Sequence, residues 1–178
     1  MYPVIRLGIE MGVAALSAPI AIEATHVSRH TCFPWDVDPW GEMNNGRILT
    51  LYDLGRVPLL ARTGVTAALK RRGWKMTMAG ANVRYRRRIT MFERVELRSR
   101  IVGRDARFLY IAQSMWRSET EAASSIVYRA ATYAGKGIVP TDDVVAELGH
   151  PDWNPPMRDW VAAWSAAEDQ RPWPPPRA

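Results

Sequence analysis

The sequence predicts an α+β domain in which one long helix is followed by a run of antiparallel strands. Apolar residues recur with a helical period from Asn44 to Gly64, and they alternate with polar residues after Gly73. The length of 178 residues is enough for one domain with a substantial core. The long helix is therefore expected to cover one face of a single sheet.

Residues 1–20 are expected to form a helical segment ahead of the domain. This helix should pack on the domain or lie on a membrane surface, because its apolar residues have helical spacing up to Pro19 (Val4, Ile5, Ile9, Val13 and Leu16). Arg6 and Glu10 interrupt the segment, which contains no apolar run of the roughly 20 residues that a spanning helix needs. Neither secretion nor stable membrane insertion is expected.

The domain itself is expected over residues 21–149. Residues 21–33 are rich in β-branched and aromatic side chains and predict the first strand. The long helix should begin at an N-cap, Asn44 or Asn45, and end at Gly64, with a kink at Pro58. Its apolar face comprises Ile48, Leu51, Tyr52, Gly55 and Leu59.

Four later segments predict antiparallel strands. In the first, Arg84, Arg86 and Arg88 alternate with Val83, Tyr85 and Arg87, and residues 95–101 alternate between apolar and polar side chains. Residues 108–116 are apolar on both faces, as in a central strand, and residues 126–133 predict the next strand. Residues 150–178 should add a short helix, 157–167, and a loose proline-rich tail.

Composition narrows the classes of partner. The net charge is +6, and nine arginines lie between Arg84 and Arg107, which suits nucleic acid, a membrane surface or a phosphorylated small molecule such as coenzyme A. Nucleic acid is disfavoured, because no aromatic-interleaved RNA signature accompanies the arginines. The single cysteine, Cys32, excludes a disulfide framework and indicates a reducing, cytoplasmic location.

The stretch from Pro34 to Arg47 has the clearest chemical character. It places Asp36 and Asp38 shortly before the predicted helix, whose N-terminal N–H groups can stabilise a developing negative charge. The three histidines show no metal-ligand grouping, and the sequence contains no Gly-x-Ser-x-Gly, Walker or dinucleotide-binding motif.

On these residues the chain resembles hotdog-fold thioesterases, in the branch of 4-hydroxybenzoyl-CoA thioesterase and the thioesterase-like acyl-CoA hydrolases. The resemblance covers roughly residues 21–149. Its most specific part is Trp35-Asp-Val-Asp-Pro-Trp-Gly-Glu-Met-Asn-Asn-Gly-Arg47, and further parts are Leu51-Tyr-Asp-Leu-Gly-Arg56, Arg62-Thr-Gly64, Val83–Arg88 and Phe92–Leu97. It implies a hotdog fold, in which an antiparallel sheet wraps a long central helix.

The resemblance also implies the site. The catalytic carboxylate falls on Asp38, as nucleophile or general base, and the helix N-terminal amide that polarises the thioester carbonyl falls near Asn45. Many relatives carry Gly-His-x-Asn-Asn, whereas this chain has Glu42 in place of the histidine. Glu42 cannot simply replace it, and either perturbs Asp38 electrostatically or acts as a second base.

Each of these residues also has a structural interpretation. Asp38 can form an Asx turn with Pro39, and the two asparagines can serve as helix caps. Arg84, Arg86 and Arg88 are the candidates for the coenzyme A phosphates, or are simply solvated residues on one exposed strand face.

The expected function is therefore hydrolysis of a fatty or aromatic acyl-CoA thioester, or of an acyl-carrier-protein thioester, to a free acid and a thiol. No metal or redox cofactor is expected, since coenzyme A is part of the substrate. A homodimer or a dimer of dimers is expected, because a lone sheet leaves open edges. The alternative is a non-catalytic hotdog protein that binds acyl-CoA or acyl-carrier protein.

Overall fold

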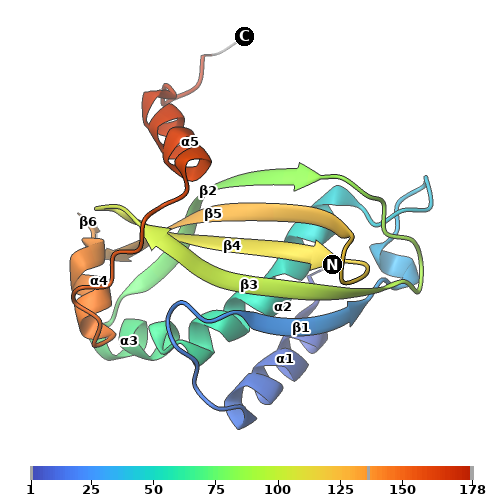
Figure 1. Ribbon diagram of the computed structural model, residues 1–178, viewed down its shortest axis with the longest axis horizontal. Helices are drawn as coiled ribbons and strands as arrows, with labels where there is room; N and C mark the ends of the chain where they lie inside the picture. Colours follow the sequence, from blue (N-terminus) through green and yellow to red (C-terminus); the bar gives the residue numbers. More distant parts are fainter. Residues whose placement is uncertain (1, 136, 177–178) are drawn as a thin grey trace.

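A computed structural model describes residues 2–135 and 137–176, and the sheet dominates it (Figure 1). The described part holds an antiparallel sheet with the strand order β1-β3-β4-β5-β2, and β6 pairs with β5. The strands are β1 (His26–Thr31), β2 (Lys75–Tyr85), β3 (Arg94–Arg104), β4 (Phe108–Trp116), β5 (Ala122–Ala134) and β6 (Gly137–Ile138). The helices are α1 (Val4–Leu16), the 3-10 turn η1 (Pro34–Asp36), α2 (Asn45–Arg62), α3 (Val65–Arg72), α4 (Thr141–Glu147) and α5 (Asp159–Gln170).

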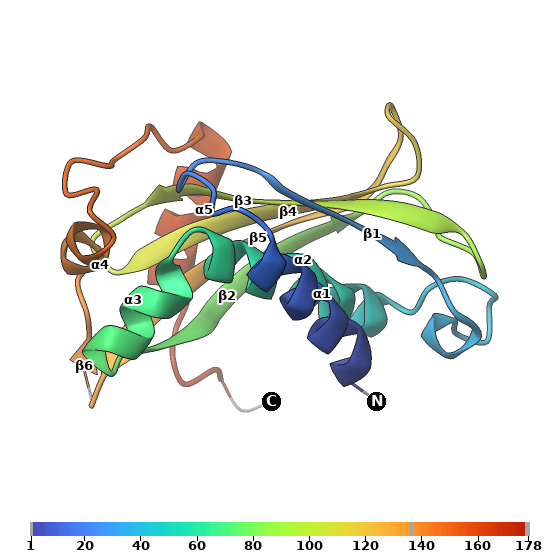
Figure 2. The same ribbon diagram turned by 90° about the horizontal axis from the view of Figure 1, so that it is seen from below.

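The long helix α2 covers the inner face of the sheet, and α1 and α3 lie on the same side (Figure 2). Its buried residues Leu51 and Leu54 pack in one core with strand residues such as Leu97 and Ile111. Gly55 allows a close approach, since an added Cβ would overlap the Oγ of Ser99 on β3. This arrangement confirms the predicted hotdog architecture.

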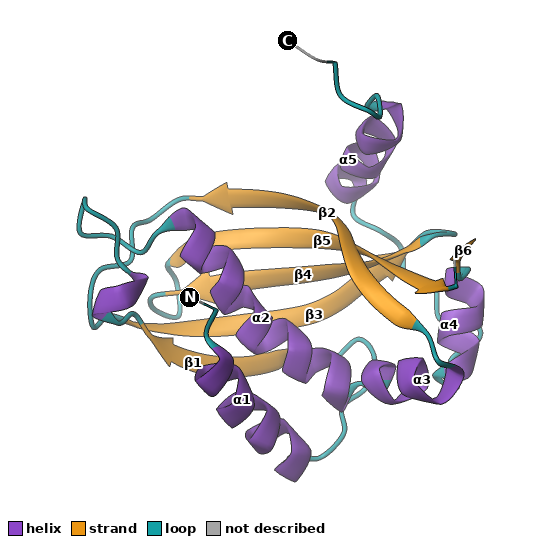
Figure 3. Ribbon diagram, turned by 180° about the vertical axis from the view of Figure 1, so that it is seen from behind, coloured by secondary structure: helices purple, strands orange, loops and turns teal. Residues whose placement is uncertain are grey.

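The outer face of the sheet is covered at one end only. There α5 packs on a smaller apolar cluster, in which Trp164 meets the ring of Tyr110 edge-on at a centroid distance of 6.4 Å. The Tyr110 hydroxyl donates to Asp105 Oδ2 at 2.6 Å and lies 2.6 Å from Ser165 Oγ, and Arg107 pairs with Asp169 at 2.7 Å. Figure 1 shows that the remainder of this face carries no helix, whereas the view from behind in Figure 3 shows α1, α2 and α3 on the inner face.

Several predicted elements are confirmed with small changes of extent. The alternation over residues 95–101 places Val95, Leu97, Ser99 and Ile101 in the core of β3, and β4 is a central strand, as expected. The first strand is shorter than residues 21–33, because the N–H of Ile20 donates to Arg62 on α2 and residues 21–24 form a turn. The C-terminal helix begins two residues later than predicted.

Gly64 ends the long helix, as expected: Arg62 is the last residue of α2, Thr63 is its C-cap, and Gly64 follows in the left-handed conformation with φ +82°. The structure differs from the predictions in two respects. Helices α3 and α4 were not expected. Arg86 and Arg88 do not continue the strand face of Arg84, because the N–H groups of Arg86 and Arg87 both donate to the Ala123 carbonyl oxygen, which ends the ladder of β2 at Tyr85.

Within the described residues, no helix is both long and apolar enough to cross a membrane.

Candidate active site

The acidic loop folds as a tight hairpin that runs directly into α2. Val37 and Met43 form an antiparallel bridge, and the N–H of Asp38 donates to the Glu42 carbonyl oxygen at 2.8 Å. Gly41 closes the turn by donating to the Asp38 carbonyl oxygen at 3.0 Å, and its φ of +79° is a left-handed conformation that favours glycine. The hairpin therefore holds Asp38 at a fixed position ahead of the helix.

Asp38 is half-buried and uses one of its two carboxylate oxygens in the turn. Oδ1 accepts the N–H groups of Trp40 at 3.0 Å and of Glu42 at 3.4 Å, so the predicted Asx turn is present. Oδ2 makes no hydrogen bond or ion pair with any residue that the structure describes. The turn thus fixes the carboxylate and leaves one oxygen available to a substrate or a water molecule.

The N-terminus of α2 leaves one backbone N–H unused. Asn44 is the N-cap, and its Oδ1 accepts the N–H groups of Gly46 at 2.9 Å and Arg47 at 3.2 Å. The N–H of Ile48 donates to the Asn44 carbonyl oxygen at 2.9 Å. The N–H of Asn45, the first of the helix, donates to none of the described residues. This amide lies at the positive end of the helix dipole and is suited to stabilise an oxyanion.

Asp36 is the structural carboxylate of the loop. Its side chain is fully buried between two arginines, with Arg6 Nη1 at 2.8 Å from Oδ2 and Arg47 Nε at 2.7 Å from Oδ1. It also accepts the N–H of Phe33 at 3.0 Å, and its carbonyl oxygen accepts the N–H of Asn44 at 2.9 Å. Because Arg6 belongs to α1, the N-terminal helix fixes the loop that carries Asp38.

Glu42 points toward the connection between β2 and β3. Its backbone forms a bridge with Thr90, and its carboxylate lies 3.5 Å from Arg88 Nε. Both side chains are accessible, with Glu42 38% and Arg88 73% exposed. The structure therefore pairs one candidate catalytic residue with one candidate phosphate ligand, which leaves Arg88 partly neutralised.

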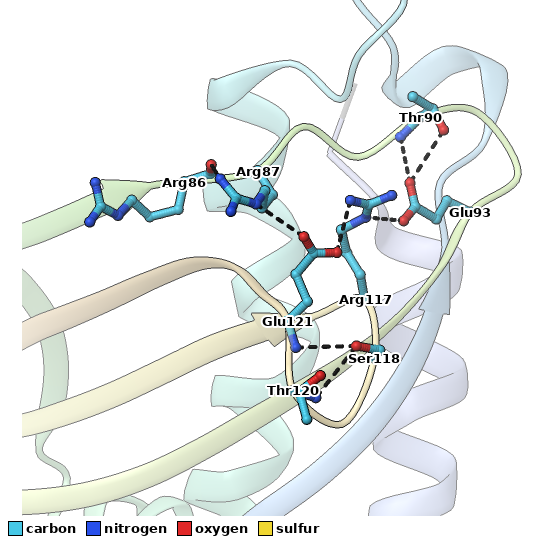
Figure 4. Close-up of polar contacts among 8 residues, drawn as sticks. All are labelled: Arg86, Arg87, Thr90, Glu93, Arg117, Ser118, Thr120 and Glu121. Carbon is cyan, nitrogen blue, oxygen red and sulfur yellow. Dashed lines mark hydrogen bonds and ion pairs between the residues drawn. The ribbon is translucent and has the colours of Figure 1, made fainter.

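A network of charged residues fixes this connection to the turn between β4 and β5 (Figure 4). Arg117 lies between Glu93 and Glu121, and Arg87 pairs with Glu121 at 3.0 Å. Glu93 accepts the N–H of Thr90 at 2.9 Å. Burial alone would raise the pKa of Glu93, but the hydrogen bonds from Thr90 and Arg117 together hold the pKa below its usual value. Thr90, which pairs with Glu42, is thereby held in place.

The three candidate phosphate ligands do not share one face of β2. Arg84 is exposed on the outer face of β2, and Arg88 pairs with Glu42 beyond the strand. Arg86 is exposed, and Figure 4 shows its side chain pointing away from the network. Tyr85 and Arg84 are neighbours on β2 and point to opposite faces of the sheet. On the inner face, the Tyr85 hydroxyl donates to the Asn45 carbonyl oxygen at 3.4 Å, and Arg84 lies on the outer face. Arg84 is thus next in sequence to a residue that contacts the N-terminus of α2.

Asp53, a carboxylate on α2, was not among the predicted site residues. Its Oδ2 accepts the hydroxyl of Tyr2 at 2.8 Å, and its Oδ1 pairs with Arg56. Burial, followed by the hydrogen bond and charge of Asp53, raises the pKa of Tyr2 to about 12. The spacing Asp53-x-x-Arg56 in the sequence could have predicted the ion pair between these two residues on one helix face. The contact between Asp53 and Tyr2 could not be predicted, because it depends on how α1 packs against α2. Both oxygens of Asp53 are occupied, unlike those of Asp38.

Two histidines of β1 lie buried beneath α1. His30 Nε2 is 2.9 Å from Ser28 Oγ, and its Nδ1 is 3.8 Å from Glu10. Burial, followed by the charges of Arg6 and His26, lowers the pKa of His30 to about 4, and burial also lowers the pKa of His26. Over residues 2–135 and 137–176, no group of three or more His, Cys, Asp or Glu is placed to hold a metal ion.

Comparison with known families gives one match over most of the chain. A family described as the thioesterase-like superfamily matches residues 32–164, which are 133 of the 178 residues. The match begins after α1, so the helix that supplies Arg6 lies outside it.

Curated relatives match a smaller part. The protein THEM6 from Xenopus laevis is 32% identical over 94 residues, which are 53% of this chain and 45% of the relative. THEM6 from Danio rerio is 35% identical over 78 residues, 44% of this chain and 39% of the relative. The matched part thus spans less than half the length of these relatives.

Solved structures share the fold. A probable thioesterase, YbaW from Escherichia coli, superposes with a TM-score of 0.65 at 12% identity, over 70% of this chain and 97% of that one. A DHNA-CoA thioesterase from Staphylococcus aureus gives a TM-score of 0.55 at 15% identity, over 82% of this chain and 91% of that one. At these identities the likeness establishes the architecture alone.

Proposed function

The chain belongs to the thioesterase-like superfamily, and on that premise we propose that it hydrolyses an acyl-CoA-type thioester to a carboxylic acid and a free thiol. Asp38 is the proposed catalytic carboxylate, and the Asn45 N–H is the proposed oxyanion donor. The DHNA-CoA thioesterase among the structural neighbours acts on a thioester of this class, which supports the choice of coenzyme A as the thiol.

The single observation that carries the proposal is a pair of unused groups in one short loop. The cap of α2 occupies the amides of Gly46 and Arg47 but not that of Asn45, and the turn occupies one oxygen of Asp38 but not the other. A loop built only for structure has no need to leave both a donor and an acceptor free. A thioester carbonyl requires both, since its oxygen becomes negative as its carbon is attacked.

Two routes use the same groups. In one, Asp38 Oδ2 attacks the carbonyl carbon, the thiolate leaves, and water hydrolyses the resulting anhydride. In the other, Asp38 takes a proton from a water molecule that attacks the carbonyl carbon, and the collapse of the tetrahedral intermediate expels the thiolate. In both routes the Asn45 N–H donates to the oxygen that gains charge.

The proposal is tested by thiol release from short, long and aromatic acyl-CoAs by the wild type and by Asp38→Asn. We expect the substitution to lower kcat by roughly 10²–10⁴-fold, which is the usual contribution of a positioned acid or base. Asp53→Asn is the matched control, because it removes a carboxylate of α2 whose oxygens are already occupied.

Two results would reject this function. Wild-type protein that binds acyl-CoA without turnover would identify a non-catalytic binding protein instead. Equal activity of the wild type and Asp38→Asn would assign the chemistry to another residue. Thermal unfolding of each variant separates loss of chemistry from loss of fold.

We further propose that the active protein is at least a homodimer. Strand β2 pairs with β5 along one side only, and its other side has no partner among the described residues over its 11 positions. Two surface hollows, of about 710 and 920 Å³, are lined by neither Asp38 nor Asn45. An acyl pocket completed by a second subunit would account for both observations, and sedimentation velocity tests it.

A further inference from the structure

The uncovered part of the outer sheet face forms a groove of about 920 Å³ that is lined by arginine and tryptophan side chains. Its floor consists of small side chains of the two middle strands, and the register places Ser114 beside Ser125 and Ala112 beside Val127. Direct cross-strand partners point to the same face of a sheet, so these four residues form one continuous surface. The groove therefore runs along β4 and β5.

The strands on either side of that floor, β2 and β3, carry arginines on the same face of the sheet. The register places Arg84 of β2 beside Ser125, and Arg98 and Arg100 of β3 beside Ser114 and Ala112. Three strand spacings separate β2 from β3, which is about 14 Å between backbones. Arginine side chains from both walls can therefore reach a ligand lying between them.

The positive charge of this groove is not compensated. Its lining contains four arginines (Arg84, Arg98, Arg100 and Arg158) and one acidic residue, Glu23. Arg98 pairs with Glu96, but the other three side chains make no ion pair or hydrogen bond with any described residue. The hollow of about 710 Å³ differs in degree: three of its four arginines (Arg29, Arg98 and Arg117) pair with glutamates, and the side chain of Arg94 alone makes no ion pair or hydrogen bond with a described residue. The larger groove thus has charge complementarity to an anion.

The ends of the groove are aromatic and apolar. Trp116 closes it at the end nearest the β4–β5 turn, with Arg98 stacked 5.5 Å from its ring, and Trp160 lines the other end, 48% exposed. Indole rings stack on planar bases, and guanidinium groups bind phosphates through paired hydrogen bonds. The volume suits a small molecule, which favours a nucleotide over a flat protein surface.

We propose that this groove binds the phosphorylated nucleotide end of the thioester substrate, with Arg84 and Arg100 on its phosphates. This inference rests on the proposed function for the identity of the ligand. Arg84 directly precedes Tyr85, the last residue of β2, whose hydroxyl contacts the Asn45 carbonyl oxygen. An extended thiol arm can therefore pass around the end of β2 from the groove to the helix N-terminus. The assignment replaces Arg86 and Arg88 as phosphate ligands.

The test uses Arg84→Gln and Arg100→Gln, with Lys75→Gln as the charge-matched control at the opposite end of β2. Calorimetry with adenosine 3′,5′-bisphosphate should show binding to the wild type and to Lys75→Gln, weakened roughly tenfold by either arginine substitution. For turnover, KM for acyl-CoA should rise roughly tenfold with kcat unchanged, while KM for the matching acyl-pantetheine, which lacks the nucleotide, stays constant.

Equal nucleotide binding by all four proteins would overturn the inference, and so would equal changes in KM for both substrates. A change of oligomeric state in the arginine variants would show instead that the groove is an interface between copies of the chain. Loss of turnover confined to acyl-carrier-protein thioesters would assign the surface to a protein. If the wild type hydrolyses no thioester, the binding measurement alone still decides the inference.

Discussion

The acidic loop on the helix side and the arginine groove on the outer face use charged side chains in opposite ways. In the loop, Asp36 is fully buried and paired with two arginines that are each less than one fifth exposed. In the groove, Arg84 and Arg100 are exposed and have no partner among the described residues. One region uses its charges to hold a backbone in place, and the other keeps its charges available.

The difference shows how structural charge is distinguished from functional charge. A buried ion cannot be left without a partner, because removing it from water costs several kcal/mol, so Asp36 must be paired whether or not the loop has a function. An exposed arginine is hydrated and needs no partner, so a cluster of them facing one groove is not required for folding. Within the loop, the groups of functional interest are the neutral or half-buried ones left over, the Asn45 N–H and Asp38 Oδ2.

Apart from the loss of the Asp38 carboxylate, the largest expected effect comes from removing the unused Asn45 amide. Asn45→Pro deletes the N–H at the first position of α2, where proline is tolerated, and Asn44, with ψ 135°, already has the conformation that precedes proline. We expect kcat for thioester hydrolysis to fall roughly 10²–10³-fold, about 3–4 kcal/mol, as for loss of one oxyanion donor. Asn45→Ala keeps the N–H and serves as the control. Similar rates for the two variants would remove the amide from the mechanism.

The next effect compares the two regions directly. Arg6→Gln leaves the buried Asp36 with one of its two arginines and removes the ion pair between α1 and the loop. We therefore expect the free energy of unfolding to fall by about 3 kcal/mol. Arg100→Gln removes an exposed charge, and its effect should stay within about 0.5 kcal/mol. Urea denaturation measures both. A large loss of stability in Arg100→Gln would show that the groove arginines are structural after all.

Much of the fold could be predicted, because period is a local property of the sequence. The alternation of Val95, Leu97, Ser99 and Ile101 appears in the structure as one buried face of β3, and the asparagine cap of α2 lies where its side chain chemistry indicates. The place where a strand ends is not local in this sense. The ladder of β2 stops because two successive N–H groups turn to the Ala123 carbonyl oxygen, and that contact separates Arg86 and Arg88 from Arg84.

The candidate site divides in the same way. Asp38 and Asn45 lie within one loop, so their proximity follows from the chain itself. The contact between Arg6 and Asp36 joins residues 30 positions apart, and the groove combines side chains of β2, β3, β4, β5 and the segment before α5. No pattern in a single sequence fixes which arginine of nine will face such a groove. That information resides in the strand register.

The smallest expected effect is a pH dependence confined to the side of the molecule held by α1. His30 is buried against Glu10, Arg6, His26 and Ser28, and its pKa of about 4 lies below the ordinary value of 6.5. As the pH falls below 6.5, this histidine becomes protonated in the unfolded chain but stays neutral in the folded protein. The free energy of unfolding therefore falls with pH until about pH 4, below which His30 is protonated in both states.

Burial raises the pKa of Glu10, which offsets part of this loss, so the net loss should be smaller than the roughly 3 kcal/mol that the pKa shift of His30 alone corresponds to. His30→Gln should flatten the decline, because glutamine stays neutral over this range. Arg100→Gln should retain the wild-type slope, since its groove contains no histidine. The measurement is the free energy of unfolding from urea denaturation between pH 7 and 4. If its dependence on pH is the same in His30→Gln as in the wild type, His30 is not the cause of the acid sensitivity.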